Sequence, residues 1–218
     1  MTADDLRDEL HFLVDDENLS ETQELSLINQ AYDRITAMRP WNFMLTEDTS
    51  KTITSGTTSY ALQSTFLYGY DDAVLAYDSS AGEVKARFKV VQFKDRMRYN
   101  NVSGYVYFDI KNNTINFCST SDTATYAGYT LFMTYYAQPA QLTASDSPVF
   151  NRAFHRLLAL EAARYFWYND QQVDGAFDGK MAREYDDLLT GLILWDDNLA
   201  TSIGDSLMPP TSWIPEVS

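Results

Sequence analysis

The chain changes from a helical to an extended pattern at Lys51-Thr52-Ile53-Thr54-Ser55-Gly56-Thr57-Thr58-Ser59-Tyr60-Ala61-Leu62. Before this stretch apolar residues recur at every third or fourth position, and from Lys51 onward the period becomes two, as in strands. Residues 52–54 and 59–62 flank Ser55-Gly56, a pair that favours a hairpin turn. The stretch therefore predicts the first strands of a β region that follows helices.

Two helices are predicted before it. A short amphipathic helix is expected over residues 2–16. A second helix opens at Ser20, because Ser20 and Gln23 have the spacing of a capping box, and it ends at Pro40. The apolar stripes of the two helices consist of Leu6, Leu10, Leu13, Val14, Leu25, Ile28, Tyr32, Ile35 and Met38.

Strand patterns continue through the middle of the chain. Residues 83–90 alternate strictly between basic and apolar side chains. Residues 104–110 and 114–118 are predicted to pair across Asn112-Asn113, because asparagine tolerates the left-handed conformation. Residues 92–99 are expected to form one helical turn or a loop. With further strands at 73–77 and 129–136, six or seven short strands imply a small antiparallel barrel or sandwich.

Helical spacing returns in the last third of the chain, over residues 149–167 and 173–199. Three prolines then remove backbone donors, so residues 200–218 are expected to be extended. This tail nevertheless carries the residue types that favour interface cores. We expect it to dock on another subunit or on a partner through Leu207, Met208, Trp213 and Ile214.

These patterns together predict an α+β fold. A helical bundle is formed by N-terminal helices (residues 1–46) and C-terminal helices (149–199). An antiparallel β barrel or sandwich (47–148) is inserted between them, and an extended docking tail (200–218) follows. The expected core anchors of the bundle are Trp41, Phe43, Phe154, Leu158 and Trp195.

Composition narrows the class of protein. The net charge of −15 argues against a surface that grips nucleic acid over the whole molecule. Acidity is concentrated in residues 1–50 and 149–218, whereas residues 51–148 hold eight acids and eight bases. The single cysteine, Cys118, excludes an internal disulfide, and no apolar run has the length of a membrane span. The acidic N-terminus is unlike a signal peptide, so a cytosol-like compartment and no membrane partner are expected.

Catalytic and metal-binding patterns are weak. Acidic clusters at 15–17, 186–187 and 196–197 could be paired carboxylates or cation ligands, but solvated helix faces or contacts between subunits explain them better. His11 and His155 have no metal-ligand spacing, and there is no nucleophile elbow or glycine-rich phosphate loop. We therefore expect no enzymatic activity, no catalytic or metal-binding residue and no cofactor.

One basic patch stands out, with six of the sixteen bases in fourteen residues. It could meet the phosphates of DNA or the acidic helices of an adjacent subunit. The second is favoured, because this acidic chain supplies such helices in plenty. The patch consists of Lys85, Arg87, Lys89, Lys94, Arg96 and Arg98.

The order of these motifs resembles that of the head-to-tail adaptor (connector) proteins of tailed bacteriophages. The resemblance covers most of residues 25–195. It departs at Cys118-Ser119-Thr120-Ser121, where family members often carry a proline-rich tract. The similar motifs are Arg39-Pro40-Trp41-Asn42-Phe43, the stretch 51–62, Phe66-Leu67, 104–117, 130–136, Gln138-Pro139, Leu142-Thr143, Ser145-Asp146 and the Leu-Ala-Leu-Glu-Ala-Ala segment at 158–163.

The resemblance implies a structural protein of the virion neck that is assembled in the host cytoplasm. It implies a homo-oligomeric ring, a dodecamer, that lies beneath the portal protein and extends the channel through which DNA passes. It also implies a platform for a tail, nozzle or tail-fibre protein. The alternative is a non-enzymatic β-rich module, carried on helices, that binds carbohydrate or peptide. Its stacking platforms would be Tyr60, Tyr68, Tyr70, Tyr105, Tyr107, Tyr126 and Tyr129.

Overall fold

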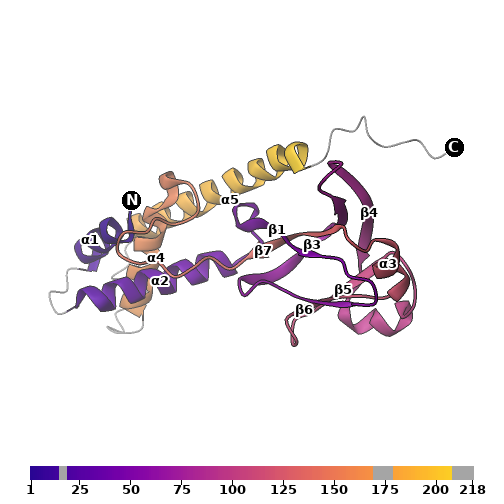
Figure 1. Cartoon of the computed structure of the whole chain (residues 1–218). Helices are drawn as coiled ribbons and strands as arrows, with labels where there is room; N and C mark the ends of the chain where they lie inside the picture. The colour runs from indigo at the N-terminus through magenta and orange to yellow at the C-terminus, as the bar shows by residue number, and fades with distance from the viewer. Residues whose placement is uncertain (15–18, 169–178, 208–218) are drawn as a thin grey trace. The chain divides into compact units, whose positions relative to one another are not determined.

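The computed structural model describes residues 1–14, 19–168 and 179–207 (Figure 1). The chain divides into two compact units: a helical unit, Met1–Phe43 with Pro139–Ser218, and a β unit, Met44–Gln138. Mixed helix and sheet is as predicted, and so is the placement of the β unit between two helical stretches. The sequence-based boundary at residue 148 is too late. Residues 139–148 belong to the helical unit, where Ala3 N donates to Asp146 O at 2.7 Å.

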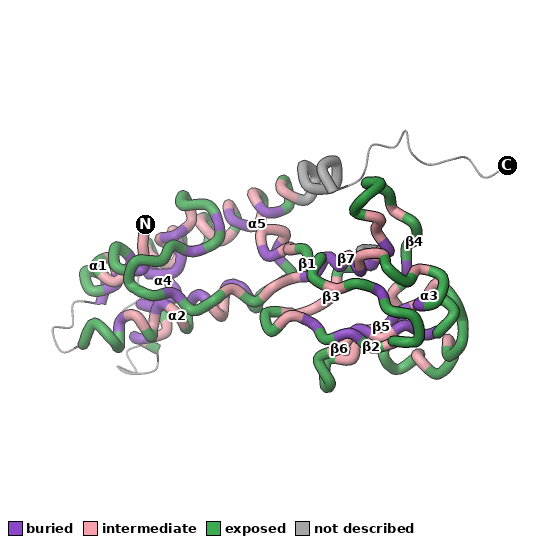
Figure 2. The backbone as a smooth tube through the Cα atoms, in the orientation of Figure 1, coloured by how far each residue is buried: buried purple, intermediate pink, exposed green. Residues whose placement is uncertain are grey.

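The helical unit is built around one buried helix. Its elements are α1 (Ala3–Val14), α2 (Glu21–Ala37), η3 (Arg152–Phe154), α4 (Arg156–Phe166) and α5 (Gly179–Leu207). Helix α4 packs against α1, α2 and α5, and Figure 2 shows it buried over most of its length. Eight of its eleven residues are buried, including Glu161, whose carboxylate pairs with Arg34 and Arg164. A helix that is apolar on most sides is expected to lie inside a bundle.

A local signal explains where α2 begins, and side-chain hydrogen bonds attach the segment 139–148 to this helix. Ser20 and Gln23 form the predicted capping box. On the body of α2, the Asn29 side chain pairs with both backbone groups of Leu142: Leu142 N donates to Oδ1 at 2.7 Å and Nδ2 donates to Leu142 O at 3.0 Å. The polar groups of an irregular segment are thereby satisfied by a helix surface.

The β unit is a single curved, nearly closed, barrel-like sheet (Figure 1). The strand order is β1-β7-β3-β4-β5-β6-β2. The described elements are η1 (Asn42–Met44, which leads into the unit), β1 (Leu45–Thr52), β2 (Ser59–Ala61), β3 (Phe66–Asp78), β4 (Glu83–Val90), η2 (Phe93–Tyr99), β5 (Tyr105–Asp109), β6 (Thr114–Phe117), α3 (Thr120–Thr125) and β7 (Thr130–Ala137). Neighbouring strands are antiparallel except β4 and β5, which are parallel, so the expectation of a fully antiparallel sheet is wrong at this pair.

The core of the β unit comes from one face of nearly every strand. Val74, Val106, Ile115 and Leu131 are fully buried within it. Long β3 pairs with both β4 and β7, and its register shifts between Gly69 and Val74. A Cβ atom at Gly69 would come 2.0 Å from Cε2 of Phe108, so the absence of a side chain there makes room for that ring.

The predicted hairpin at Ser55-Gly56 needs correction. Ser55-Gly56 does form a turn, with Gly56 at φ +80° and Thr57 N donating to Thr54 O at 3.0 Å. The flanking strands do not pair with each other, however, because β1 pairs with β7 and β2 pairs with β6. Residues 120–125, for which the sequence patterns indicated no element, form the short helix α3. The Asn112-Asn113 hairpin between β5 and β6 is confirmed, with Asn113 at φ 51°.

The C-terminal boundary is also different from the expectation. Helix α5 continues to Leu207, so the prediction of an extended tail from residue 200 is wrong for residues 200–207. Residues 208–218 lie outside the described residues.

The register of β1 against β7 shifts between Asp48 and Lys51, and the hydrogen bonds at this shift, called the bulge below, allow a test of the β unit by pH. Burial of the Asp48 carboxylate raises its pKa, but hydrogen bonds from Lys51 and Ser50 outweigh this and lower the pKa to about 2, against an ordinary value of 3.8. A lowered pKa stabilises the folded state above the ordinary pKa, and that stability is lost as the pH falls toward 2. We expect Asp48→Asn to cost about 2 kcal/mol at neutral pH and almost nothing near pH 2.

Thermal unfolding of both proteins between about pH 7 and pH 2 measures this difference. Exposed Glu47, the preceding residue, provides the control, because Glu47→Gln removes one carboxylate without touching the bulge. A difference between wild type and Asp48→Asn that stays constant across the acid range would contradict the assignment.

Candidate interaction surfaces

The exposed row of β4 carries three bases. Lys85, Arg87 and Lys89 are exposed, and the side chains between them point toward the core. The row is anchored by Phe88, which is 1% exposed and packs edge-on against Phe117 with ring centroids 5.0 Å apart. Strict alternation in the sequence therefore has its expected consequence, a basic row on the outside of the strand.

The segment that follows β4 adds the other three bases. It forms the 3₁₀ helix η2, in which side chains three positions apart lie in line. Phe93 packs against Tyr107 with centroids 6.0 Å apart, and Tyr99 packs against Tyr105 at 4.6 Å. The Arg96 guanidinium lies over the Phe93 ring at 3.8 Å and donates to Phe93 O at 2.8 Å. Lys94 and Arg98 are exposed.

The six bases of the patch differ in whether they already form an ion pair or another contact within the chain. Lys85 pairs with Glu83 at 2.7 Å and with Asp78 at 3.6 Å, and the hydrogen bond to Glu83 raises the pKa of Lys85. Arg96 is held against Phe93. Within the described part of the chain, no carboxylate pairs with the remaining four, which are Arg87, Lys89, Lys94 and Arg98.

In the helical unit, acidic residues outnumber basic residues. It holds twenty-two acidic and eight basic residues, a net charge of −14, whereas the β unit holds nine and eight. Five arginines of the helical unit form ion pairs with carboxylates of the same unit: Arg7, Arg34, Arg39, Arg156 and Arg164. The helical unit thus carries the excess of acidic residues, and the β unit carries the four bases of the patch that have no ion pair among the described residues.

The expected core anchors come from distant parts of the sequence into one cluster. Trp41 stacks on Phe43 with centroids 5.3 Å apart, and Phe43 stacks on Trp195 of α5 at 6.0 Å. Phe154 packs against Trp195 at 6.2 Å. Leu158 and Trp41 are fully buried, whereas Phe43, Phe154 and Trp195 are partly exposed.

A buried carboxylate beside this cluster was not predicted. Asp196 is 0% exposed, and it accepts hydrogen bonds from Phe43 N at 3.1 Å and Asn42 Nδ2 at 3.2 Å. The prediction of a solvated acidic pair at 196–197 is therefore wrong for Asp196, although Asp197 is exposed and pairs with Arg39 at 2.6 Å. The spacing of the residues could have indicated that Asp196 is buried, because Asp196 follows buried Leu192 by four positions on the same helix face.

The other ionisable candidates do not form a reactive site. Asp186 and Asp187 are exposed, and residues 15–17 lie outside the described residues. His11 Nδ1 lies 2.9 Å from Glu24 Oε1. Both ring nitrogens of buried His155 face backbone carbonyls, those of Met1 at 3.0 Å and Phe150 at 2.9 Å. Among the described residues, no group of three or more His, Cys, Asp and Glu side chains could hold a metal ion.

The tyrosines of the alternative hypothesis are spread over different environments. Tyr60 is buried, and its hydroxyl accepts from Thr54 N at 2.8 Å. Tyr126 and Tyr129 pack against the β core, and Tyr105 and Tyr107 support η2. Tyr68 and Tyr70 pack against Tyr136. The seven side chains thus do not form a single stacking platform.

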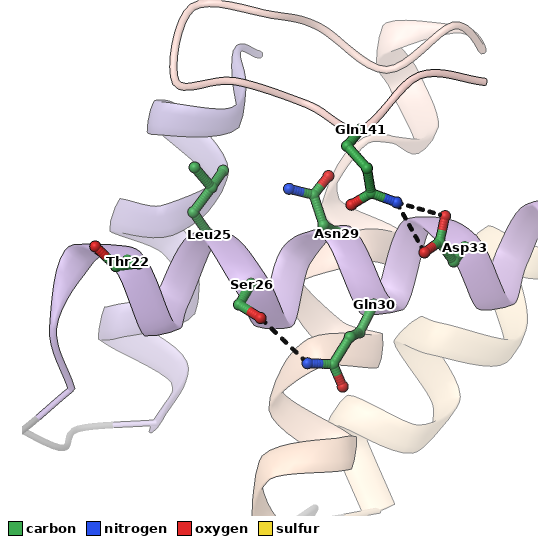
Figure 3. Close-up of a pocket in the computed structure, with 7 residues that line it drawn as sticks. All are labelled: Thr22, Leu25, Ser26, Asn29, Gln30, Asp33 and Gln141. Atoms are coloured by element: carbon green, nitrogen blue, oxygen red, sulfur yellow. Dashed lines mark hydrogen bonds between the residues drawn. The ribbon is translucent and has the colours of Figure 1, made fainter.

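A shallow groove of about 320 Å³ lies along the polar face of α2 (Figure 3). Its polar groups largely bind one another. Gln141 Nε2 donates to both carboxylate oxygens of Asp33, at 2.9 and 2.8 Å, and Gln30 Nε2 donates to Ser26 Oγ at 3.3 Å. No aromatic residue lines the groove, which is formed by Thr22, Leu25, Ser26, Asn29, Gln30, Asp33 and Gln141. It therefore lends no support to a carbohydrate site.

The expected docking residues of the tail are only partly described. Leu207 is the last residue of α5. Met208, Trp213 and Ile214 lie outside the described residues. None of the described helices combines the length and apolarity that a membrane span requires.

Comparison with known proteins places the chain in a family. No curated protein matches the chain. The sequence model of the SU10 adaptor protein family matches residues 1–204, nearly the whole of the 218-residue chain. The match includes both units and the basic patch. The chain therefore belongs to the SU10 adaptor protein family, a family of phage head-tail adaptors, and is a structural adaptor.

Proposed function

We propose that this adaptor forms a dodecameric ring beneath the phage portal. The ring extends the DNA channel and provides the platform to which a tail, nozzle or tail-fibre protein attaches. The protein acts without turnover, and its place is the neck of the virion after assembly in the host cytoplasm. The observation that carries the proposal is the family match over residues 1–204.

The distribution of charge supports self-association. A helical unit with a net charge of −14 is complementary, between copies, to a basic patch in which Arg87, Lys89, Lys94 and Arg98 have no ion pair among the described residues, and neither unit needs a further partner to supply the opposite charge. Electrostatic complementarity chiefly fixes orientation and speeds association. We assign the basic patch to contacts between subunits, and DNA is the competing partner.

The assignment to a neighbouring subunit also agrees with the chemistry of a channel. Strong binding of the phosphate backbone would raise the cost of moving DNA during packaging and ejection, since each neutralised phosphate adds affinity. A net negative protein reduces that affinity.

Electron microscopy of the purified protein, alone and with the portal of the same phage, tests the proposal. We expect twelvefold rings attached coaxially to the portal, with a continuous central channel. Raising the salt concentration should weaken the rings, because exposed charge pairs are screened over about 10 Å at 0.1 M salt. Single copies bound at the portal periphery, or no association under either condition, would show that the proposed ring is wrong.

A further inference from the structure

Helix η2 presents an unusual combination of exposed side chains. It has seven residues, longer than most 3₁₀ helices, and none of them is buried. Phe93, Arg96 and Tyr99 are spaced by three and lie toward β5, as their ring contacts show. The rows beside them carry Met97, which is 74% exposed, together with exposed Lys94, Asp95 and Arg98, two bases and one acid. Such an apolar side chain between free cations is typical of a surface that another protein covers.

Helix α1 presents the complementary combination. Its buried face consists of Ala3, Leu6, Leu10, Leu13 and Val14. On the opposite face Phe12 is 81% exposed, and Asp8 lies one turn before it, exposed and without an ion pair among the described residues.

Neither base on α1 pairs with Asp8. Arg7 pairs with Asp4 of the same helix at 3.1 Å and with Glu21 and Glu24 of α2 at 3.7 Å. His11 is also bound to Glu24. The exposed surface around Phe12 is therefore acidic with an apolar centre, whereas the surface around Met97 is basic with an apolar centre.

We propose that the exposed face of α1 in one copy binds η2 of the next copy, with Phe12 against Met97 and Asp8 opposite Lys94 and Arg98. The inference rests on the proposed ring, and it names the surfaces that make the ring. Because the two surfaces differ, the contact is head-to-tail, and such contacts generate closed rings when the rotation between copies closes.

Two other partners fit less well. DNA would account for Lys94 and Arg98 but gives exposed Met97 no apolar partner on the phosphate backbone. Helix α5 also exposes an apolar side chain, Leu194 at 60%. Its exposed acids Asp186 and Asp187 lie about two turns before Leu194, however, and not one turn as on α1. The same face includes the base Arg183, and Asp197 is already paired with Arg39.

Cross-linking tests the contact directly. The full-length variant Phe12→Cys/Met97→Cys, treated with a short bismaleimide in its assembled state, should give a ladder of covalent multimers. Both replaced side chains are exposed, so the fold should be retained. The matched control Leu194→Cys/Met97→Cys should give no ladder, and neither should the single variants; native Cys118 is buried.

A charge exchange provides a second, independent measurement. Arg98→Glu should weaken assembly on the order of tenfold, and Asp8→Lys in the same chain should restore it, because the pair is then reversed rather than broken. Rings that form normally in the cysteine variant without any ladder, or with intramolecular cross-links alone, would overturn the inference and leave the ring intact. Failure of the wild-type protein to assemble would instead overturn the proposed function, and the inference with it.

Discussion

Replacing Trp41 with alanine is expected to lower the free energy of unfolding by about 4 kcal/mol. The indole is fully buried and stacks on Phe43, so its removal leaves a large cavity at the centre of the aromatic cluster. The replacement also removes the hydrogen bond from Nε1 to Ile35 O, which measures 2.8 Å. That carbonyl lies in the last turn of α2 and also accepts from Met38 N at 3.3 Å, so the replacement removes the shorter of its two hydrogen bonds.

Urea unfolding followed by circular dichroism measures this effect. Trp41→Phe provides a matched variant, because it keeps an aromatic ring in the cluster and loses only the hydrogen bond and part of the volume; its expected cost is about 2 kcal/mol. Tyr168→Ala, at a side chain that is 77% exposed in the same unit, provides the exposed control, and it should change stability by less than about 0.5 kcal/mol. A cost below about 1 kcal/mol for Trp41→Ala would mean that the cluster does not hold the helical unit together.

The parts of the fold that the sequence predicted are those with local causes. The capping box at Ser20 and Gln23 determines the start of α2, and the alternation of Glu83 to Val90 determines the two faces of β4. Asparagine at position 113 permits the tight turn between β5 and β6. In each case the residues that decide the conformation lie within a few positions of one another.

Pairings between distant strands could not be derived in the same way. The Ser55-Gly56 turn reverses the chain, but it does not decide which strand each flanking segment joins. Thr52 pairs with Thr130 and Ser59 with Asn116, so the partners are contributed by strands more than fifty residues away. The parallel pair β4–β5 likewise depends on η2, a connection that the sequence left open as a turn or a loop.

The described end of α5, Leu207, lies eight residues beyond the predicted end at residue 199, and the local residue types explain why the helix continues. Gly204 lies inside a helix that continues to Leu207. A glycine in a helix costs only about 1 kcal/mol relative to alanine, whereas proline costs about 3 kcal/mol and restricts the residue before it. Pro209 is therefore the stronger boundary signal, and it agrees with a helix that ends before Met208.

For the candidate surfaces, the sequence predicted where the bases lie but not which of them already form ion pairs. Spacing alone placed Lys85, Arg87 and Lys89 on one side of a strand. It could not indicate that Lys85 is engaged by Asp78 and Glu83, because Asp78 reaches it only through the pairing of β3 with β4. The exposed pair of surfaces at η2 and α1 was missed, since exposure of Phe12 and Met97 is a property of the folded chain.

Deletion of residues 208–218 should leave a folded protein that no longer joins the portal. Every buried residue that the structure describes lies before this segment, so circular dichroism and the melting temperature should be close to those of the wild type. The deleted segment carries Met208, Trp213 and Ile214 between prolines that prevent a regular helix or an internal strand. Side chains of this kind are the anchors that dominate binding energies, so their loss should abolish association rather than reduce it slightly.

Sedimentation of the truncated protein with the portal measures the loss, and substitution of Trp213 alone by alanine shows whether one anchor carries most of it. The deletion should begin at residue 208, because removal of residues 203–207 would also shorten α5 and confuse docking with folding. A variant with Ser212→Ala keeps the length and the prolines of the tail, and it should bind like the wild type. If the truncated protein attaches to the portal normally, the docking surface must lie on the helical or β unit, and the assignment of Leu207, Met208, Trp213 and Ile214 to portal binding is wrong.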